Sequence, residues 1–476
     1  MIDFFVKMMY NTHMIYERNG LLLPERTTPQ IDSDLSESLR VALGGPAETY
    51  KDLELSNEKK EVVTKAWHNH QNADLLVEEI DAVDLDLKKN ALVRWKQELL
   101  AKEDLDPLVK QLYRWKVNEH IANVNILIAS KNGDMNSFRR WNEFIYDTPD
   151  EDIYRGALDW VANDADTLLA VTDQNPSIIE AAEEVRHLLK DRRGYRELLA
   201  PDEKIFEAVR ADHMRTTGFY GLLLASIDIP DKKITTEIGD PILERVLQNI
   251  GSTKPIVDAT GSSWGASSRG IERPAIMNMP VKRFIGLGLG HEIGSHELER
   301  TNGYRGPLAL AAEGLDRYES GNEGRAVIRE QVPYETFEEF GKIVRWRDIL
   351  RRHIAISFAV GVGEARPASS SETYDFINTI DRMYQTQLKP NEPDVARVAA
   401  RKKTDALLLN VLKGTDGQGG AYLKNKVYLE GHVANWLTAA LKGPASISEG
   451  DLGKFDINNA RHIHALQAVG LLPEQG

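Results

Sequence analysis

A six-residue segment, His291-Glu-Ile-Gly-Ser-His296, constrains the local fold more than any other stretch of this chain. Its two histidines lie five positions apart, whereas one turn of an α-helix holds about 3.6 residues. In a regular α-helix the two side chains would therefore point about 140° away from each other. The imidazoles can face one point only if the helix is locally wider, as in a one-residue π-bulge. Gly294, between the histidines, would tolerate that distortion.

The residue types of this segment indicate a chemistry. Imidazole nitrogens are favoured ligands of zinc and similar divalent ions. A carboxylate beside the first ligand is where a metallohydrolase carries its general base. We therefore expect His291 and His296 to be metal ligands and Glu292 to be the general base. The alternative is an ordinary surface helix with two unrelated histidines, because the motif is short and departs from the common H-E-x-x-H spacing.

Four glycines, Gly286, Gly288, Gly290 and Gly294, lie in or just before this predicted helix. Each costs about 1 kcal/mol relative to alanine in a helix interior, so their presence needs a reason. Close helix packing under the site, or a non-helical approach up to about Leu289, would supply one. A phosphate-binding loop is a weaker interpretation, because the spacing is not G-x-G-x-x-G and no Gly-Lys-Ser/Thr follows.

Further motifs follow the histidine segment in a fixed order. They are Gly314-Leu-Asp-Arg-Tyr-Glu-Ser-Gly-Asn-Glu-Gly-Arg-Ala326, Lys424-Asn-Lys-Val-Tyr-Leu-Glu-Gly431 and Gly453-Lys-Phe-Asp456. Together they resemble a metallopeptidase family with a H-E-I-G-T-H core and a Gln-Glu-Gly-Leu-Ala motif, which includes the microtubule-associated tyrosine carboxypeptidase. The resemblance covers the C-terminal half to two-thirds of the chain. Ser295, Asn322 and Arg325 depart from the Thr, Gln and Leu of the family motifs.

The resemblance implies a third metal ligand, because the glutamate of the second motif falls on Glu323. From the residues alone, Glu313 and Glu319 compete for this role, since any carboxylate on a following helix could turn inwards. Two histidines, one glutamate and an open position form a catalytic rather than a structural zinc site. The resemblance implies one Zn²⁺ ion and removal of a C-terminal residue, tyrosine or another aromatic, from a peptide or protein.

Three further residues are candidates for the site. Tyr318, five residues before Glu323, is a candidate oxyanion donor, with ordinary packing as the alternative. Arg269 and Arg273 flank an expected strand over 271–279 that ends at Pro280. Either guanidinium could bind a substrate carboxylate through a bidentate fork, and either could be plain surface charge. The strand itself could pair with an extended peptide or be a simple edge strand.

Composition limits the other classes of function. The 476 residues carry a formal net charge of −14, which argues against nucleic-acid binding. There is no cysteine, so any metal site must use histidine and carboxylate. The N-terminus lacks a signal-peptide pattern, and the longest apolar stretch elsewhere, near 354–362, is too short to span a membrane. We therefore expect a soluble cytoplasmic protein without a nucleic-acid or membrane partner; the sequence leaves the oligomeric state open.

Helix start and stop signals indicate the overall organisation. Helices are predicted from Asp106-Pro107 to Asn132-Gly133, from Asn175-Pro176 to about Gly194, and from Asp240-Pro241 to Gly251. The sequence predicts an irregular lead-in over 1–56, a helical N-terminal region over 57–204, and a zincin-like metallopeptidase catalytic region over 205–476. The expected fold class is α+β and predominantly α-helical, with a small antiparallel sheet beside the metal helix.

Two interpretations without catalysis remain open at this stage. The chain could be an inactive relative that binds a structural metal or none. It could also be a regulatory protein that acts through its helical N-terminal region. Full zinc occupancy with an unfilled coordination position would oppose the inactive relative. The regulatory protein predicts that replacing Glu292 with glutamine has no effect on function, whereas a hydrolase requires that carboxylate.

Overall fold

The structure is a computed structural model that describes residues 30–43, 52–78, 81–190, 192, 195–217, 233–259, 263–267 and 269–473. The described chain is mostly helical, as predicted. Its helices up to the first strand are α3 (Ser33–Leu43), α5 (Asn57–His68), α6 (Ala82–Ala101), α7 (Pro107–Lys131), α8 (Met135–Tyr146), α9 (Glu151–Leu169), α10 (Pro176–Leu188), η1 (Arg196–Leu199) and α11 (Glu203–Thr217).

The strands and the helices around them follow in the middle of the chain. These elements are β1 (Lys233–Thr235), α13 (Thr236–Asn249), β2 (Ile256–Ala259), β3 (Gly265–Ala266), β4 (Ile271–Pro274), β5 (Asn278–Pro280), α14 (Val281–Arg283), η2 (Phe284–Glu297), α15 (Leu298–Arg305) and α16 (Leu310–Glu313).

The remaining elements are again helical. They are α17 (Glu319–Gln331), α18 (Phe337–Gly341), α19 (Val344–Val360), α20 (Ser370–Leu388), α21 (Pro393–Val411), η3 (Leu423–Lys426), α22 (Val427–Lys442), α23 (Ala445–Glu449), η4 (Gly450–Leu452) and α24 (Ala460–Ala468). None of the described helices is long and apolar enough to cross a membrane.

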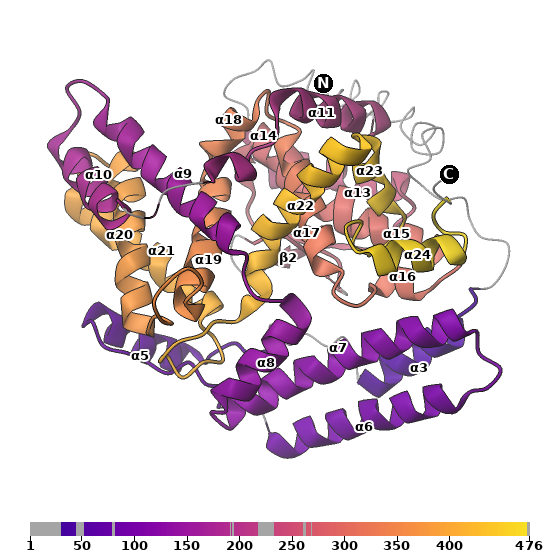
Figure 1. Cartoon of the computed structure of the whole chain (residues 1–476). Helices are drawn as coiled ribbons and strands as arrows, with labels where there is room; N and C mark the ends of the chain where they lie inside the picture. Colours follow the sequence, from indigo (N-terminus) through magenta and orange to yellow (C-terminus); the bar gives the residue numbers. More distant parts are fainter. Residues whose placement is uncertain are drawn as a thin grey trace.

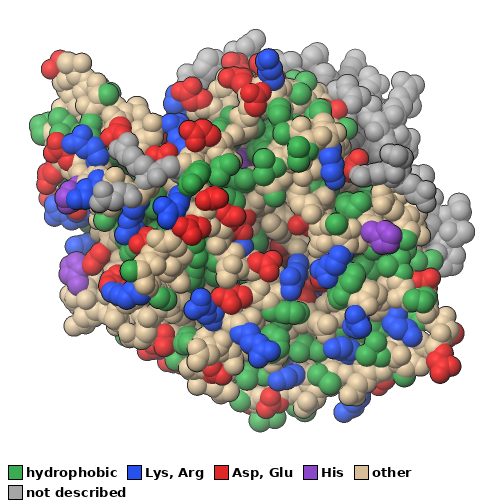
Figure 2. Space-filling view, in the orientation of Figure 1, with side chains coloured by type: hydrophobic (Ala, Val, Ile, Leu, Met, Phe, Trp, Pro, Cys, Tyr) green, Lys and Arg blue, Asp and Glu red, His purple; other side chains and the backbone are tan. Residues whose placement is uncertain are grey.

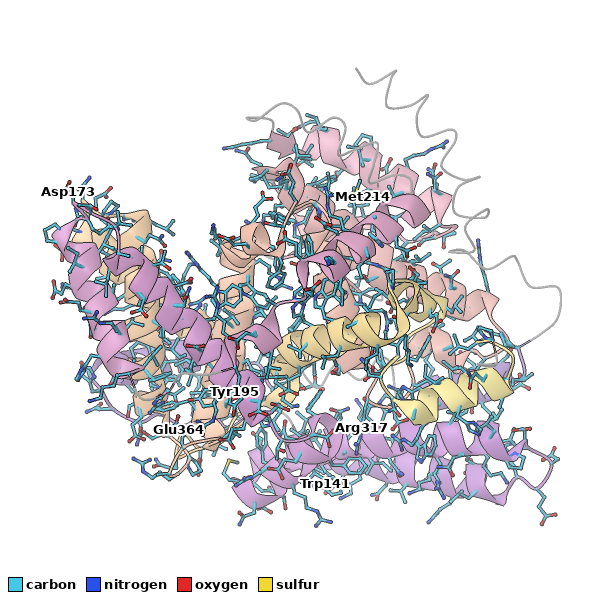
Figure 3. The ribbon with its side chains drawn as sticks, turned by 45° about the horizontal axis from the view of Figure 1, so that its top comes forward. Trp141, Asp173, Tyr195, Met214, Arg317 and Glu364 are labelled. Atoms are coloured by element: carbon cyan, nitrogen blue, oxygen red, sulfur yellow. The ribbon has the colours of Figure 1, made fainter. Side chains whose placement is uncertain are left out.

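The helices form three groups (Figure 1). Helices α3, α6, α7 and α8 make a layer along the bottom of the view, and α9, α10, α19, α20 and α21 stack at the left. The third group contains α17, which packs against both α22 and η2. Figure 3 labels Arg317 at the face of the bottom layer, where its guanidinium lies 4.8 Å from the centre of the Phe144 ring. Charged side chains of both signs are interspersed over the face seen in Figure 2.

Several helix boundaries follow the predicted signals. Helix α7 begins at Pro107 behind the N-cap Asp106, and α10 begins at Pro176 behind the N-cap Asn175. The predicted end of α10 near Gly194 is wrong, because the helix stops at Leu188. The predicted start at Asp240 is also wrong: α13 begins at Thr236 and contains Pro241. The first turn of α13 packs closely, because a Cβ on Gly239 would meet Met277 at 2.5 Å.

The irregular lead-in predicted over 1–56 contains a helix, α3. Residues 1–29 and 44–51 of that lead-in lie outside the described residues. The carboxylate of Asp32, just before α3, accepts hydrogen bonds from the backbone N–H groups of Ala309 (2.6 Å) and Leu310 (3.0 Å). It also accepts one from the hydroxyl of Tyr113 at 2.7 Å. The two amides lie 277 and 278 residues from Asp32 in sequence, so a local sequence pattern cannot predict these contacts.

The strands form two small sheets beside η2. Strand β1 pairs antiparallel with β5, and β4 pairs antiparallel with β3 and parallel with β2. The small antiparallel sheet is therefore present, with one parallel strand added. The single strand predicted over 271–279 is wrong: a bend at Ala275-Ile276 divides it into β4 and β5, which join different sheets. Pro274 lacks the N–H that an uninterrupted ladder needs.

Two hydrophobic cores underlie this arrangement. The larger core combines helices of the N-terminal region with α17, α19, α20, α21 and α22. The smaller core lies between α13, the strands and η2, and includes Leu243, Ile271, Phe284 and Ile293. The larger core thus continues across the predicted boundary at 204, while the division into domains and the zincin-like character of the C-terminal region stay predictions.

A buried histidine links α22 to the rest of the larger core. His432 is completely buried, its Nδ1 lies 3.1 Å from the Gln331 amide nitrogen, and its Nε2 lies 3.2 Å from the Leu199 carbonyl oxygen. A neutral ring with its proton on Nε2 satisfies both partners. Burial lowers the pKa of His432 to about 4, against an ordinary value of 6.5. The fold therefore holds this ring neutral.

This histidine predicts loss of stability in acid. Between pH of about 6.5 and 4 the unfolded chain binds a proton at His432 and the folded chain does not, so stability falls as the pH falls through this window. The contribution is present in full above pH 6.5 and amounts to about 3 kcal/mol. We expect the thermal midpoint of H432Q to depend less on pH between 7.5 and 4.5 than that of the wild type. Parallel pH profiles for the two proteins would refute this assignment.

Candidate metal centre

The segment that carries the histidines is a π-helix. Helix η2 runs from Phe284 to Glu297, fourteen residues, and is much longer than the one-residue bulge that the spacing required. A π-helix closes its hydrogen bonds between residues i and i+5, so residues five apart lie one turn from each other. The rings of His291 and His296 accordingly approach to 4.9 Å between their centres, with their planes at 85°. The predicted local widening is confirmed, and its extent is greater than predicted.

The glycines of η2 let helix α17 pack against it. A Cβ on Gly286 would lie 2.7 Å from the carbonyl oxygen of Glu330, and one on Gly290 would lie 3.0 Å from that of Arg329. Only glycine permits this approach without a shift of the backbone. Of the two reasons proposed for the glycines, close helix packing under the site is therefore the correct one.

Helix α17 places Glu323 against both histidines. Its Oε2 lies 3.5 Å from Nε2 of His291 and 3.5 Å from Nε2 of His296. The Glu292 Oε1 lies 3.9 Å from the same nitrogen of His291. His291, Glu292 and His296 form a group whose ligand atoms all lie within 4.8 Å of one another, and this group can hold a metal ion.

The two competing glutamates face other partners. Glu313 is exposed and accepts a hydrogen bond from the hydroxyl of Tyr304 at 2.7 Å. Glu319 pairs with Nζ of Lys424 at 2.6 Å. Of the three glutamates considered from the sequence, Glu323 is thus the one that meets both imidazoles.

The donor atoms fit a divalent ion. Oε2 of Glu323 is buried and has no hydrogen-bond partner among the described residues, which is costly for a carboxylate oxygen. Its two separations of 3.5 Å from imidazole nitrogens are close to the edge, about 3.4 Å, of a tetrahedron with metal–ligand bonds of about 2.0–2.1 Å. Two nitrogen donors and one carboxylate oxygen form a set that zinc accepts.

The carboxyl groups of Glu292 and Glu323 have pKa shifts in opposite directions. Burial raises the pKa of Glu292, and the nearby carboxylates of Glu323 and Glu330 raise it further against the opposing effect of the histidines. Burial also opposes ionisation of Glu323, but the charges and contacts of His296 and His291 outweigh it and hold its pKa well below its usual range. Glu323 therefore has the charge of a ligand, while Glu292 can accept and release a proton.

A third glutamate, Glu330, lies near the ring nitrogen of His291 that does not face Glu323. Oε1 of Glu330 lies 2.7 Å from Nδ1 of His291, which leaves Nε2 facing Glu323. Burial opposes ionisation of Glu330, but the charges of Arg345 and His291 lower its pKa to about 2. Burial disfavours the imidazolium of His291, yet Glu292 and Glu330 raise its pKa to about 10.

The centre opens into a large cavity of about 1670 Å³. Residues of α3, α7, η2, α17, α19 and α22 are among those that line it. His291, Glu292, His296 and Glu323 line it, and so does Tyr318. The sequence prediction therefore placed these five residues at one site.

The two candidate arginines lie elsewhere. Neither Arg269 nor Arg273 lines this cavity. The Arg273 fork donates to both carboxylate oxygens of Asp240, at 2.8 and 2.7 Å, and its Nη1 also contacts Asp258. Arg269 is exposed and pairs with Glu272 at 2.8 Å. The donors of Arg273 thus connect β4 to α13 and β2, and the role of either arginine in substrate binding stays a prediction.

Sequence reasoning missed four residues around the centre: Glu330, Arg345, Arg352 and Tyr428. Glu330 lies seven residues after Glu323, a spacing that places both on one face of a helix and could have revealed it. Tyr428 lies within the motif that begins at Lys424, but that motif does not show where its ring points. The arginines of α19 have no sequence signal, since tertiary packing alone brings this helix to the cavity.

No family model matches this chain, and neither a curated protein nor a solved structure matches it. The resemblance noted in the sequence therefore stays a prediction, and function is inferred from the geometry.

Proposed function

We propose that this protein is a zinc-dependent peptidase that removes a residue from the C-terminus of a peptide or protein. One observation carries the proposal: a buried oxygen of Glu323, without a hydrogen-bond partner in the described part of the chain, faces two imidazole nitrogens at 3.5 Å, beside Glu292 and at the wall of a cavity. His291, His296 and Glu323 would hold the ion. A Zn²⁺ ion in such a site polarises a carbonyl and lowers the pKa of a water molecule that it binds.

The residues of this chain have separate tasks in the reaction. Glu292 takes a proton from the water that attacks the scissile carbonyl carbon, and then delivers it to the leaving amine nitrogen. Its raised pKa suits both steps. Oε1 of Glu330 lies 2.7 Å from Nδ1 of His291, and its negative charge favours the tautomer whose Nε2 is free to face the centre. Tyr318 and Tyr428 both line the cavity, and either hydroxyl is a candidate donor to the developing oxyanion.

An arginine of α19 supports the carboxypeptidase mode. Arg352 lines the cavity with its guanidinium 5.5 Å from the centre of the Tyr428 ring, and no carboxylate of the described chain forms an ion pair with it. Its neighbour Arg345, in contrast, is paired with Glu330. Burial raises the pKa of Tyr428, the charge of Glu323 raises it further and that of Arg352 lowers it, so this tyrosine lies near both groups. We propose Arg352 as the residue that binds the terminal carboxylate of the substrate.

The test compares peptides that differ only at their C-terminus. Wild-type protein loaded with zinc should release the last residue from a peptide with a free carboxylate, and should leave the C-terminal amide of the same peptide intact. The R352M variant should raise KM for the free acid and lower kcat/KM by roughly 100-fold, the loss of one charge-assisted bidentate contact of about 3 kcal/mol. Mass spectrometry of the products gives both readouts.

Matched controls separate binding from folding. The R269M variant removes an exposed arginine outside the cavity and should leave kcat/KM unchanged. Equal cleavage of the acid and the amide by the wild type would overturn the carboxypeptidase mode and favour an endopeptidase. Absence of cleavage from a diverse peptide library, with zinc bound, would overturn the peptidase proposal.

A further inference from the structure

The wide helical register of η2 has to be stabilised, because an isolated chain prefers the α-helix and forms π turns only rarely. In the α register His291 and His296 would diverge, and the site proposed above would not exist. The inference that follows rests on that proposed function. It concerns two residues that touch neither the ion nor the substrate, Ser295 and Arg329.

The change from π-helix to α-helix falls at Leu298. Its N–H donates to the carbonyl oxygens of Ile293, five residues back, and of Ser295, three residues back. This amide therefore passes over the carbonyl of Gly294, which lies between the two acceptors. A half-buried carbonyl without a donor is costly, and this one lies between the two metal histidines.

Arg329 supplies the missing donor. Its Nη1 donates to the carbonyl oxygen of Gly294 and, at 3.2 Å, to Oγ of Ser295. Its Nη2 donates to Oδ1 of Asp451, and Arg329 and Asp451 are each about 1% exposed. The guanidinium is therefore a fixed group and not a surface side chain that happens to touch the helix.

Ser295 holds the same turn from within η2. Its hydroxyl donates to the carbonyl oxygen of Gly290 at 3.0 Å, five residues back, and the side chain is fully buried. This bond spans one π turn and lies beside His291. Arg329 and Ser295 thus form one connected network across the segment that carries both histidines.

Arg329 also lies on the helix that completes the centre. Helix α17 carries Glu323, which faces both imidazoles, and Glu330, which contacts Nδ1 of His291. Arg329 lies between Glu323 and Glu330 in sequence. The packing of α17 against η2 therefore determines three things together: the position of the Glu323 carboxylate, the orientation of His291 and the register of η2.

We infer that Ser295 and Arg329 are positioning residues that hold η2 in the π register, and so keep the two histidines converged on the metal. Removing either bond should let the segment relax towards the α register and move His296 away from Glu323. Metal affinity should fall by about 10–100-fold, the range found for partners that orient metal ligands.

The experiment uses Co²⁺ as a probe in the full chain. Visible absorption during titration gives both the dissociation constant and the ligand-field bands, which report coordination geometry. S295A should weaken Co²⁺ binding and shift the bands, whereas S295T, which keeps the hydroxyl, should restore both. R329K keeps a positive charge beside Asp451 but loses the second guanidinium nitrogen that donates to Gly294 and Ser295, so it should resemble S295A.

A matched control exists on the same helix. Arg325 is equally buried and pairs with Glu299 at 2.9 Å, but it contacts neither Gly294 nor Ser295. R325K should therefore bind Co²⁺ with wild-type affinity and bands. Wild-type behaviour of S295A and R329K, or an R325K effect equal to that of R329K, would overturn the inference. A wild-type protein that binds no Co²⁺ would instead overturn the proposed function, and the inference with it.

Discussion

Replacing Glu292 with glutamine should abolish peptide hydrolysis and leave the metal bound. The change removes the carboxylate that accepts the proton of the attacking water but preserves the size and polarity of the side chain. Loss of a general base typically lowers the rate by about 10²–10⁴-fold. The measurement is kcat on the cleaved peptide, together with the zinc content of E292Q by mass spectrometry.

The outcome distinguishes two roles for this residue. Glu292 belongs with His291 and His296 to the group of ligand atoms within 4.8 Å of one another, so it is also placed to bind the ion. Loss of zinc from E292Q would make it a ligand and not the base. Cleavage by E292Q at the wild-type rate would show that Glu292 is not the general base, whereas an inactive or regulatory protein predicts no cleavage by the wild type either. E319Q is the control, because Glu319 lines the same cavity but pairs with Lys424, and it should keep both zinc and activity.

Replacing Glu323 with alanine should remove the metal itself. Its Oε2 is the buried oxygen that faces both imidazoles, and a site with two histidines alone lacks the charge and the third donor of a catalytic zinc centre. We expect zinc affinity to fall by more than the roughly 100-fold that loss of an orienting partner produces. Zinc content after purification without added metal, for wild type and E323A, is the measurement.

The control for this experiment is Glu313, which was a candidate ligand from the sequence. It is exposed and bonded to Tyr304, so E313A should keep near-stoichiometric zinc. Equal zinc in E323A and the wild type would exclude Glu323 as a ligand. A wild type without zinc, even after dialysis against it, would end the peptidase proposal.

Local sequence patterns predicted much of the helical structure but not its exceptions. Asp106-Pro107 and Asn175-Pro176 start α7 and α10, because an N-cap carboxylate or amide followed by proline acts within one turn. Helix α3 was missed, since its anchor is the bond from Asp32 to amides near residue 310. The expected strand over 271–279 divides because its two halves find partners in β2 and β1, which lie at different places in the sequence.

The site shows the same division. Residue types and spacing alone determined that any metal would be held by imidazole and carboxylate, and that His291 and His296 require a widened helix. Tertiary structure decided how far that widening extends and which of the candidate glutamates meets both imidazoles. It also paired Arg273 with Asp240 and placed Arg352 at the cavity. The physical reason is that ligand types and helical angles are local properties of the chain. Whether side chains converge depends on tertiary packing, here of α17 against η2 and of α19 at the edge of the cavity.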